Sequence, residues 1–264
     1  MLQSLKESKE LSVYSMAKLL DVNPSNVYYN KKYDLYIPLK VMNVIDRIHT
    51  DHPEWGFRHM AQELISMGYQ VPEYKIKNLM SEMAIHAVYS DLNNTCDITE
   101  YPYLLNANVI DRPNKAWYVG LSYIRLKYGF AFLSIVMDYY SFYVIEWYIN
   151  KILGTDLVLE PLKNSLKVSV PEIVNSNQGI PFNDAYIEFL SEHNIPISMN
   201  NKYRWTNDFV DDWFRNLKYN EIYNNDYDDI KHAKKRINDY IKRYNSEPIP
   251  ALNGNTPADI YSKR

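Results

Sequence analysis

Residues 117–149 read WYVGLSYIRLKYGFAFLSIVMDYYSFYVIEWYI, and this stretch decides the fold. Aromatic and β-branched residues dominate three runs in it, which are Trp117–Ile124, Phe130–Asp138 and Phe142–Ile149. Lys-Tyr-Gly and Tyr-Tyr-Ser separate the runs. Runs of this composition with short turns between them predict an antiparallel meander of three strands.

Downstream of the meander, helical and extended patterns alternate. We expect helices and short strands in the order Asp156–Leu166 (helix), Glu172–Asn175 (strand), Asp184–Glu192 (helix), Ile195–Met199 (strand), Thr206–Tyr219 (helix) and Asp228–Tyr244 (helix). This order predicts an α/β fold of the ribonuclease-H-like kind, with a mixed five-stranded sheet and flanking helices. The closing residues 246–264 contain Pro248, Pro250, Gly254 and Pro257, so we expect an irregular strap across the core.

A first helical segment, residues 1–36, is expected upstream of the sheet. Asn23 is a candidate N-cap and Pro24 follows it at the first helical position, which suggests a helix-turn-helix. The side chains that would face DNA in such a motif are Ser25, Asn26 and Tyr28. A plain helical hairpin remains the alternative.

A second helical segment, residues 37–89, is predicted to be a three-helix module. Apolar residues recur at helical spacing after Pro38, and the next helices are expected at residues 55–67 and 73–84, with Gly68 ending the earlier one. Its candidate DNA-binding residues are Arg58, Lys75 and Lys77, although acidic residues outnumber the basic ones nearby. The complete expected division is 1–36, 37–89, a linker at 90–109, the core at 110–245 and the strap at 246–264.

Composition places the chain among ordinary globular proteins. Of its 264 residues, 46% are hydrophobic and 23% are charged. No stretch approaches the roughly 18 apolar residues of a membrane span, and the start lacks a signal-peptide pattern, so we expect an intracellular protein with no membrane partner. Cys96 is the single cysteine, which excludes an internal disulfide and a cysteine-based zinc cluster. The six histidines show no metal-binding spacing.

The charge balance argues mildly against binding to nucleic acid. Lys plus Arg is 29 and Asp plus Glu is 32, giving a formal net charge of -3, whereas contact with DNA draws on basic residues. Any such contact must therefore be local. One candidate patch consists of Lys231, Lys234, Lys235, Arg236, Lys242 and Arg243, opposed only by Asp239. A solvated helix face is the alternative interpretation.

Several local motifs occur in the order found in one family. They are Leu20–Tyr29, Trp55–Arg58, Lys77–Met83, Tyr101–Leu105, Arg112–Trp117, Asp138–Ser141, Pro171–Gly179, Ile197–Met199, Phe209–Val210, Leu217–Tyr219, Tyr244–Asn245 and Thr256–Tyr261. With these motifs the chain resembles the OrfB-type transposases of the third insertion-sequence family, which share the retroviral integrase core. The resemblance covers nearly the whole chain.

The resemblance implies a metal-dependent polynucleotidyl transferase. Family members hold two Mg²⁺ or Mn²⁺ ions with three acidic residues, and these ions clamp the attacking and leaving oxygens during strand cleavage and joining. The partners implied are DNA at the element ends, further copies of the chain and a small OrfA-type protein. The implied location is the cytoplasm, in association with the nucleoid.

The three acidic positions are only partly kept in this sequence. The first aspartate of the family aligns with Gly120 and the second with Asn177, so neither position supplies a carboxylate. The third position aligns with Asp211, which keeps a carboxylate on a shorter side chain, and Lys218 lies seven residues beyond it as a candidate DNA contact. Other family positions have changed at Phe142, Thr206 and Pro248–Pro250. We therefore expect binding of Mg²⁺ or Mn²⁺ to be weak or lost, with Asp211 and Asn177 as the remaining candidate ligands.

Three interpretations remain open: an active transposase, a domesticated DNA-binding descendant without catalysis, and the product of a decaying transposase gene. The lost acids favour an inactive protein. Substitute ligands could come from Asp111, Asp184, Asp208 or Asp212, whereas Asp138 matches an aspartate of the family that is not a ligand. The narrow tolerance of a metal site, about half an ångström, argues against such a rescue.

Overall fold

The computed structural model describes residues 36–85, 101–105, 110–176, 182–199 and 208–263. The expected helix-turn-helix at residues 15–30 lies outside these residues. The chain divides into two units, Met1–Lys40 and Val41–Arg264, and the second holds everything described below, apart from the first residues of α4. None of the helices in the described ranges is long and apolar enough to cross a membrane.

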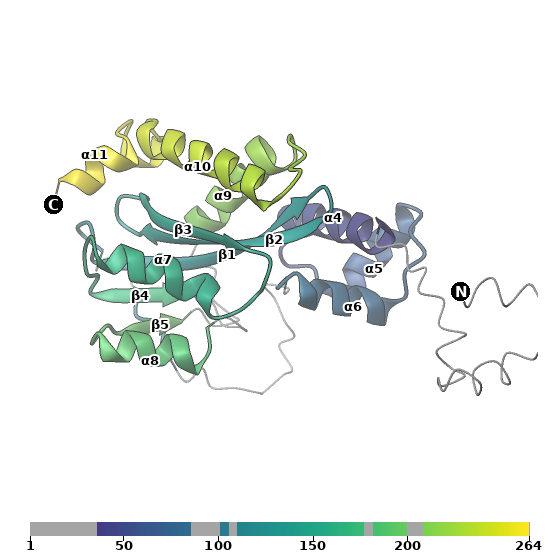
Figure 1. Cartoon of the computed structure of the whole chain (residues 1–264), viewed down its shortest axis with the longest axis horizontal. Coiled ribbons are helices and arrows are strands. Elements are labelled where there is room, and N and C mark those ends of the chain that lie inside the picture. Colours follow the sequence, from purple (N-terminus) through teal and green to yellow (C-terminus); the bar gives the residue numbers. More distant parts are fainter. Residues whose placement is uncertain (1–35, 86–100, 106–109, 177–181, 200–207, 264) are drawn as a thin grey trace, which may run out of the picture. The chain divides into compact units, whose positions relative to one another are not determined.

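Three helices form the module that the apolar spacing predicts. They are α4 (Tyr36–Asp51), α5 (Phe57–Ser66) and α6 (Glu73–Glu82) (Figure 1). Gly68 takes the left-handed conformation directly after α5, with φ of +87°, and this reverses the chain as the sequence predicts. Each helix buries apolar side chains, with Ile45, Leu64 and Ile76 fully enclosed.

Five strands form one mixed sheet, confirming the predicted fold class. They are β1 (Ala116–Leu126), β2 (Gly129–Asp138), β3 (Val144–Asn150), β4 (Ile173–Ser176) and β5 (Ile197–Met199). The order is β3-β2-β1-β4-β5, in which β1, β2 and β3 are antiparallel neighbours while β4 and β5 run parallel to β1. This is the ribonuclease-H-like arrangement.

Helices cover both faces of the sheet (Figure 1). They are α7 (Asp156–Leu166), α8 (Asp184–Glu192), α9 (Asp208–Leu217), the π-helical turn η1 (Lys218–Ile222) and α10 (Ile230–Ser246). Buried side chains of α9 and α10 pack with Tyr118 on one face, whereas those of α7 and α8 pack with Trp117 on the other. Because strand residues alternate between faces, every second residue of β1 points toward α9 and α10.

The structure corrects the predicted start of the third strand. β3 begins at Val144, because Phe142 takes a left-handed conformation with φ of +59° in the turn after β2. The aromatic composition around Phe142 suits a strand, but its stacking on Phe209, with ring centroids 3.5 Å apart, keeps it in the turn.

The prediction of an irregular closing strap is wrong. Pro250–Leu252 forms a 3-10 turn, η2, and Pro257–Ser262 forms a short helix, α11. The backbone N–H of Asp259 donates to the Thr256 hydroxyl at 3.0 Å, and Pro257 occupies the first helical turn, where it needs no hydrogen-bond donor. Proline in this segment therefore starts a helix instead of excluding one.

Candidate functional site

The positions that align with the family's catalytic acids lie on β1, directly after β4, and on α9. Gly120 of β1 pairs with Ile135 of β2, and the preceding Val119 pairs with Ser176, the last residue of β4. The described part of β4 therefore ends beside Gly120. Asn177, the next residue, lies outside the described residues.

Aromatic rings occupy the space that a side chain at position 120 would need. A Cβ atom added to Gly120 would lie 2.5 Å from Cε1 of Tyr118 and 2.9 Å from Cε2 of Phe214. Both rings are buried, with Tyr118 only 2% exposed and Phe214 8% exposed. Neither ring can move aside cheaply in a close-packed core, so position 120 has no room for a carboxylate side chain.

The helix that carries Asp211 turns apolar residues toward the sheet. Val210, Trp213, Phe214 and Leu217 of α9 are buried in the core that covers this face, whereas Asp211 is exposed. The Phe214 ring that closes position 120 therefore comes from the same helix as the remaining carboxylate. Sequence alignment assigned Asp211 to the site, but the face of α9 that approaches Gly120 is aromatic.

The residues present do not fit a pair of divalent cations. Mg²⁺ requires hard oxygen ligands in tight octahedral geometry. Gly120 supplies no ligand, and the rings of Tyr118 and Phe214 take its place. Within the described ranges, no group of three or more histidine, cysteine, aspartate or glutamate residues could hold a metal ion. We therefore derive no metal-dependent step for this chain.

Asp138, a family motif residue, organises a turn. Its buried carboxylate accepts hydrogen bonds from the backbone N–H of Asn114 at 2.6 Å, from that of Ser141 at 2.8 Å and from the Ser141 hydroxyl at 2.6 Å. Burial raises the pKa of Asp138, and these donors oppose the increase. With its oxygens engaged in this way, Asp138 is not a candidate metal ligand.

Asn114 extends this turn into a network that includes the C-terminal helix. Its side-chain oxygen accepts hydrogen bonds from the indole N–H of Trp117 at 3.0 Å and from the Tyr261 hydroxyl at 2.9 Å. The Tyr261 ring also stacks on Tyr143, with centroids 4.6 Å apart. Three of the motifs identified in the sequence thus meet in one structural cluster.

The other candidate carboxylates are not gathered at Gly120. Asp111 pairs with Arg112 at 3.1 Å, Asp184 begins α8, and Asp212 is exposed on α9 beside Asp211. Asp208 is the first residue of α9. Among the carboxylates whose side chains the structure describes, Asp111 and Asp212 form no metal-binding group with other acids or histidines.

The helical module brings two of its predicted DNA-binding residues together. The Arg58 guanidinium lies 5.6 Å and the Lys77 ammonium 5.8 Å from the centroid of the Phe57 ring. Both cations are exposed, whereas Lys75 is half-buried. Ser25, Asn26 and Tyr28 lie outside the described residues.

The structure corrects the assignment of Lys218 as a DNA contact. Lys218 is 7% exposed, and its ammonium donates to Oδ1 of Asp46 at 2.5 Å and to the Thr50 hydroxyl at 3.3 Å. The other oxygen of Asp46 accepts from the Tyr223 hydroxyl at 2.8 Å. Together with burial, this carboxylate raises the pKa of Tyr223. Lys218 therefore joins α4 to η1 and is not available to a phosphate.

The basic segment predicted in the tail forms part of α10. Lys234 and Lys235 are exposed on this helix, as the DNA-binding prediction requires. Arg236 is bound instead to the buried Glu221 of η1, with Nε donating at 2.8 Å and Nη2 at 3.1 Å. The patch thus contains exposed lysines, which are free to face solvent, and one arginine whose guanidinium binds a buried carboxylate of η1.

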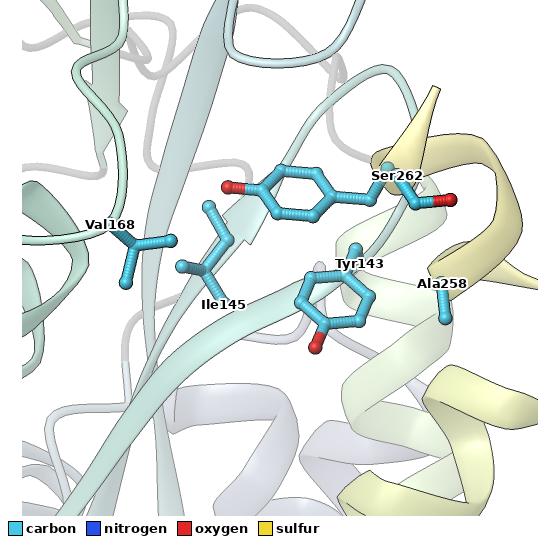
Figure 2. Close-up of a pocket in the computed structure, with 6 residues that line it drawn as sticks. Tyr143, Ile145, Val168, Ala258 and Ser262 are labelled. Atoms are coloured by element: carbon cyan, nitrogen blue, oxygen red, sulfur yellow. The ribbon is translucent and has the colours of Figure 1, made fainter. Parts of the chain in front are cut away.

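A pocket at the edge of the sheet is lined by apolar and hydroxyl-bearing side chains. Figure 2 shows Tyr143, Ile145 and Val168 around one space, with Ala258 and Ser262 of α11 beside it; Tyr261 completes the lining. These residues include no carboxylate, imidazole or amine. Of the candidate residues that the structure describes, neither Gly120 nor Asp211 lines this pocket.

Sequence reasoning missed the residues that close the site. Tyr118 and Phe214 are ordinary core aromatics by pattern, and Asp46 lies on the buried side of a predicted helix. One signal was present, because a glycine inside a strand often marks close approach of another group. That signal at Gly120 indicates a contact but cannot say which residue makes it.

Comparison with known proteins gives sequence relatives from one class. The chain is 26% identical over 264 aligned residues to the putative transposase InsK for insertion sequence element IS150 of Escherichia coli K12, covering 93% of each chain. It is 22% identical to the transposase for IS629 of Shigella sonnei, covering 60% of this chain and 55% of that protein. No protein-family model matches.

Among solved structures, the HTLV-2 integrase catalytic core domain in complex with magnesium is similar, with a TM-score of 0.46 and 17% sequence identity. The match covers 58% of this chain and 98% of that one. The identification itself depends on the sequence relatives, on the ordered motifs and on the sheet order found here. The chain is therefore similar to insertion-sequence transposases, in agreement with its resemblance to the OrfB type of the third insertion-sequence family, and its five-stranded sheet has the ribonuclease-H-like order.

Proposed function

We propose that this protein is a transposase-derived DNA-binding protein that does not cleave or join DNA strands. The observation that carries the proposal is the closed position 120, where the rings of Tyr118 and Phe214 stand in place of a metal-binding carboxylate. The phosphoryl transfer of this family depends on its metal ions for most of the charge stabilisation. Without the first acid and the space around it, that stabilisation is lost.

The integrity of the remaining core supports a folded product. The sheet is covered on both faces by buried apolar residues, and Asp138 has several hydrogen-bond donors. Gly120 supplies no metal ligand, while the hydrogen bonds around Asn114 are all formed. This contrast favours a domesticated binding protein over a product of unselected decay, which is the second candidate.

The partner that we propose is DNA, contacted by exposed cations. Arg58 and Lys77 of the helical module and Lys234 and Lys235 of α10 are the candidates among the described residues. Self-association, a small OrfA-type partner and a cytoplasmic, nucleoid-associated location remain proposals drawn from the family. The division at residues 36, 89, 109 and 245 also remains a prediction.

Strand cleavage and joining by the unaltered protein test this proposal. DNA carrying the element's ends is incubated with the protein in Mg²⁺ and in Mn²⁺, beside a relative that keeps all three acids. We expect rates lower than those of that relative by a factor on the order of 10⁴ to 10⁶. DNA binding is measured on the same substrates by gel shift and is expected to persist.

A variant separates true activity from contamination in this assay. Cleavage by the unaltered protein that disappears in Asp211→Asn would prove a working metal site and disprove the proposal. The triple variant Gly120→Asp, Asn177→Asp and Asp211→Glu restores the three acids, but the rings of Tyr118 and Phe214 still crowd position 120. We therefore expect the restored acids by themselves to leave the protein inactive.

A further inference from the structure

One face of α10 carries four lysines that form no ion pair with any acid in the described part of the chain. Lys231, Lys234, Lys235 and Lys242 are all exposed. At 3.6 residues per turn, these four positions fall within an arc of about 100°. They extend over about 16 Å along the helix axis, at 1.5 Å per residue.

We call these four residues the lysine stripe of α10. The charged groups around the stripe leave its net charge positive. The structure pairs Arg236 with Glu221 at 2.8 Å and Arg243 with Glu247 at 3.7 Å, so the arginines of α10 are neutralised by acids. None of the four stripe lysines lies within ion-pair distance of an acid among the residues that the structure describes. Asp239 is the only acid inside this part of α10, and it lies beside the stripe, not within it.

The opposite side of α10 is fixed to the core. Ala233, Ile237, Tyr240 and Ile241 are buried, and the Asn245 side chain exchanges hydrogen bonds with the backbone of Val144 at 3.0 Å and 2.9 Å. A stripe of cations on a rigid helix meets a ligand without the entropic cost of ordering its backbone. Its ligand must present several negative charges along a line of comparable length.

We propose that the lysine stripe of α10, defined as Lys231, Lys234, Lys235 and Lys242, binds the phosphate backbone of duplex DNA without reading sequence. Each DNA strand carries a phosphate about every 3.4 Å along the axis, so a stripe of about 16 Å spans about five of them. The stripe contains no arginine, the residue that most often reads guanine, and flexible lysines act on phosphates as point charges. This inference rests on the DNA-binding part of the proposed function.

The test compares two variants of equal net charge. The stripe variant changes all four lysines to glutamine: Lys231→Gln, Lys234→Gln, Lys235→Gln and Lys242→Gln. The control variant changes four exposed lysines elsewhere: Lys151→Gln, Lys163→Gln, Lys167→Gln and Lys263→Gln. Thermal melting by circular dichroism verifies that both variants fold. Binding to labelled duplexes of two unrelated sequences is measured by fluorescence anisotropy over a range of salt concentrations.

We expect the stripe variant to lose at least about tenfold in affinity at low salt, on both duplexes. The slope of log affinity against log salt concentration should fall by about 3 to 4, since each phosphate contact contributes about 0.9. The control variant should keep the slope of the unaltered protein. Equal weakening of both variants, or an unchanged stripe variant, overturns the inference while the proposed function stands.

Two further outcomes are distinguishable. If the unaltered protein binds neither duplex, the DNA-binding part of the proposed function fails and this inference fails with it. If the stripe variant loses binding to anionic phospholipid vesicles but keeps its affinity for DNA, the stripe serves a membrane surface and the inference is wrong.

Discussion

At the scale of single residues, Gly120 shows how two aromatic rings can pack against a strand backbone inside the core. Glycine lets the rings of Tyr118 and Phe214 approach the β1 backbone, and both rings then join the core beneath α9. A carboxylate introduced at position 120 would therefore require those aromatic rings to move.

Gly120→Ala provides the simplest measure of this crowding. The new Cβ would lie 2.5 Å from the Tyr118 ring, so we expect a loss of about 1 to 3 kcal/mol in the free energy of unfolding, which is the usual effect of overpacking. Gly154→Ala is the matched control, since its Cβ would meet only Cγ2 of Ile152, at 3.9 Å. Urea denaturation of both variants gives the values. A Gly120→Ala protein as stable as Gly154→Ala would show that the rings move aside freely.

At the scale of elements, a buried ion pair joins the helical module to the integrase-type core. Asp46 of α4 and Lys218 of η1 are 1% and 7% exposed, and the contact is reinforced by Tyr223 and Thr50. A second, more exposed contact links Asp51 to Arg215 at 3.3 Å and to the Tyr219 hydroxyl at 2.5 Å. The module is thus attached through α4 to the end of α9.

Lys218→Met should destabilise the protein strongly. It leaves the Asp46 carboxylate buried without its cation, and breaking such a pair costs about 3 to 5 kcal/mol. Lys163→Met is the control, because the Lys163–Glu160 pair is exposed and should contribute less than about 1 kcal/mol. The double variant Asp46→Leu with Lys218→Met should recover much of the loss. Equal stability of Lys218→Met and Lys163→Met in urea denaturation would contradict a buried pair.

At the scale of the whole molecule, charge is unevenly distributed. The chain has a formal net charge of -3, yet the four lysines of the α10 stripe face outward together. Net repulsion from DNA and local attraction therefore oppose each other. An association that depends on a small positive surface is sensitive to screening, because salt reduces the gain from counterion release.

DNA binding by the unaltered protein should consequently be weak and strongly dependent on salt. With about four phosphate contacts, affinity should fall on the order of 10²-fold between about 50 mM and about 200 mM salt. Titrations by fluorescence anisotropy at several salt concentrations measure the slope. Binding that stays tight above about 0.3 M salt would indicate many more contacts, or base contacts that the described surface does not supply.

Much of the fold was predictable because its signals are local. The bounds of α7 and α8 follow directly from apolar spacing, and those of β1 and β2 differ by two residues at most from the aromatic and β-branched runs. Local signals failed at Phe142, where a stack on Phe209 decides the turn, and at Pro257, where proline starts a helix.

The sequence alone determined that positions 120 and 177 carry no carboxylate, because this is a matter of residue identity. Tertiary structure decided which side chains surround Gly120 and which groups Lys218 binds. Phe214 contacts Gly120 from a helix that is far away in the sequence. Lys218 binds Asp46, which precedes it by 172 positions. Contacts between residues so far apart in sequence depend on packing and desolvation in the folded chain. The local sequence pattern therefore does not predict them.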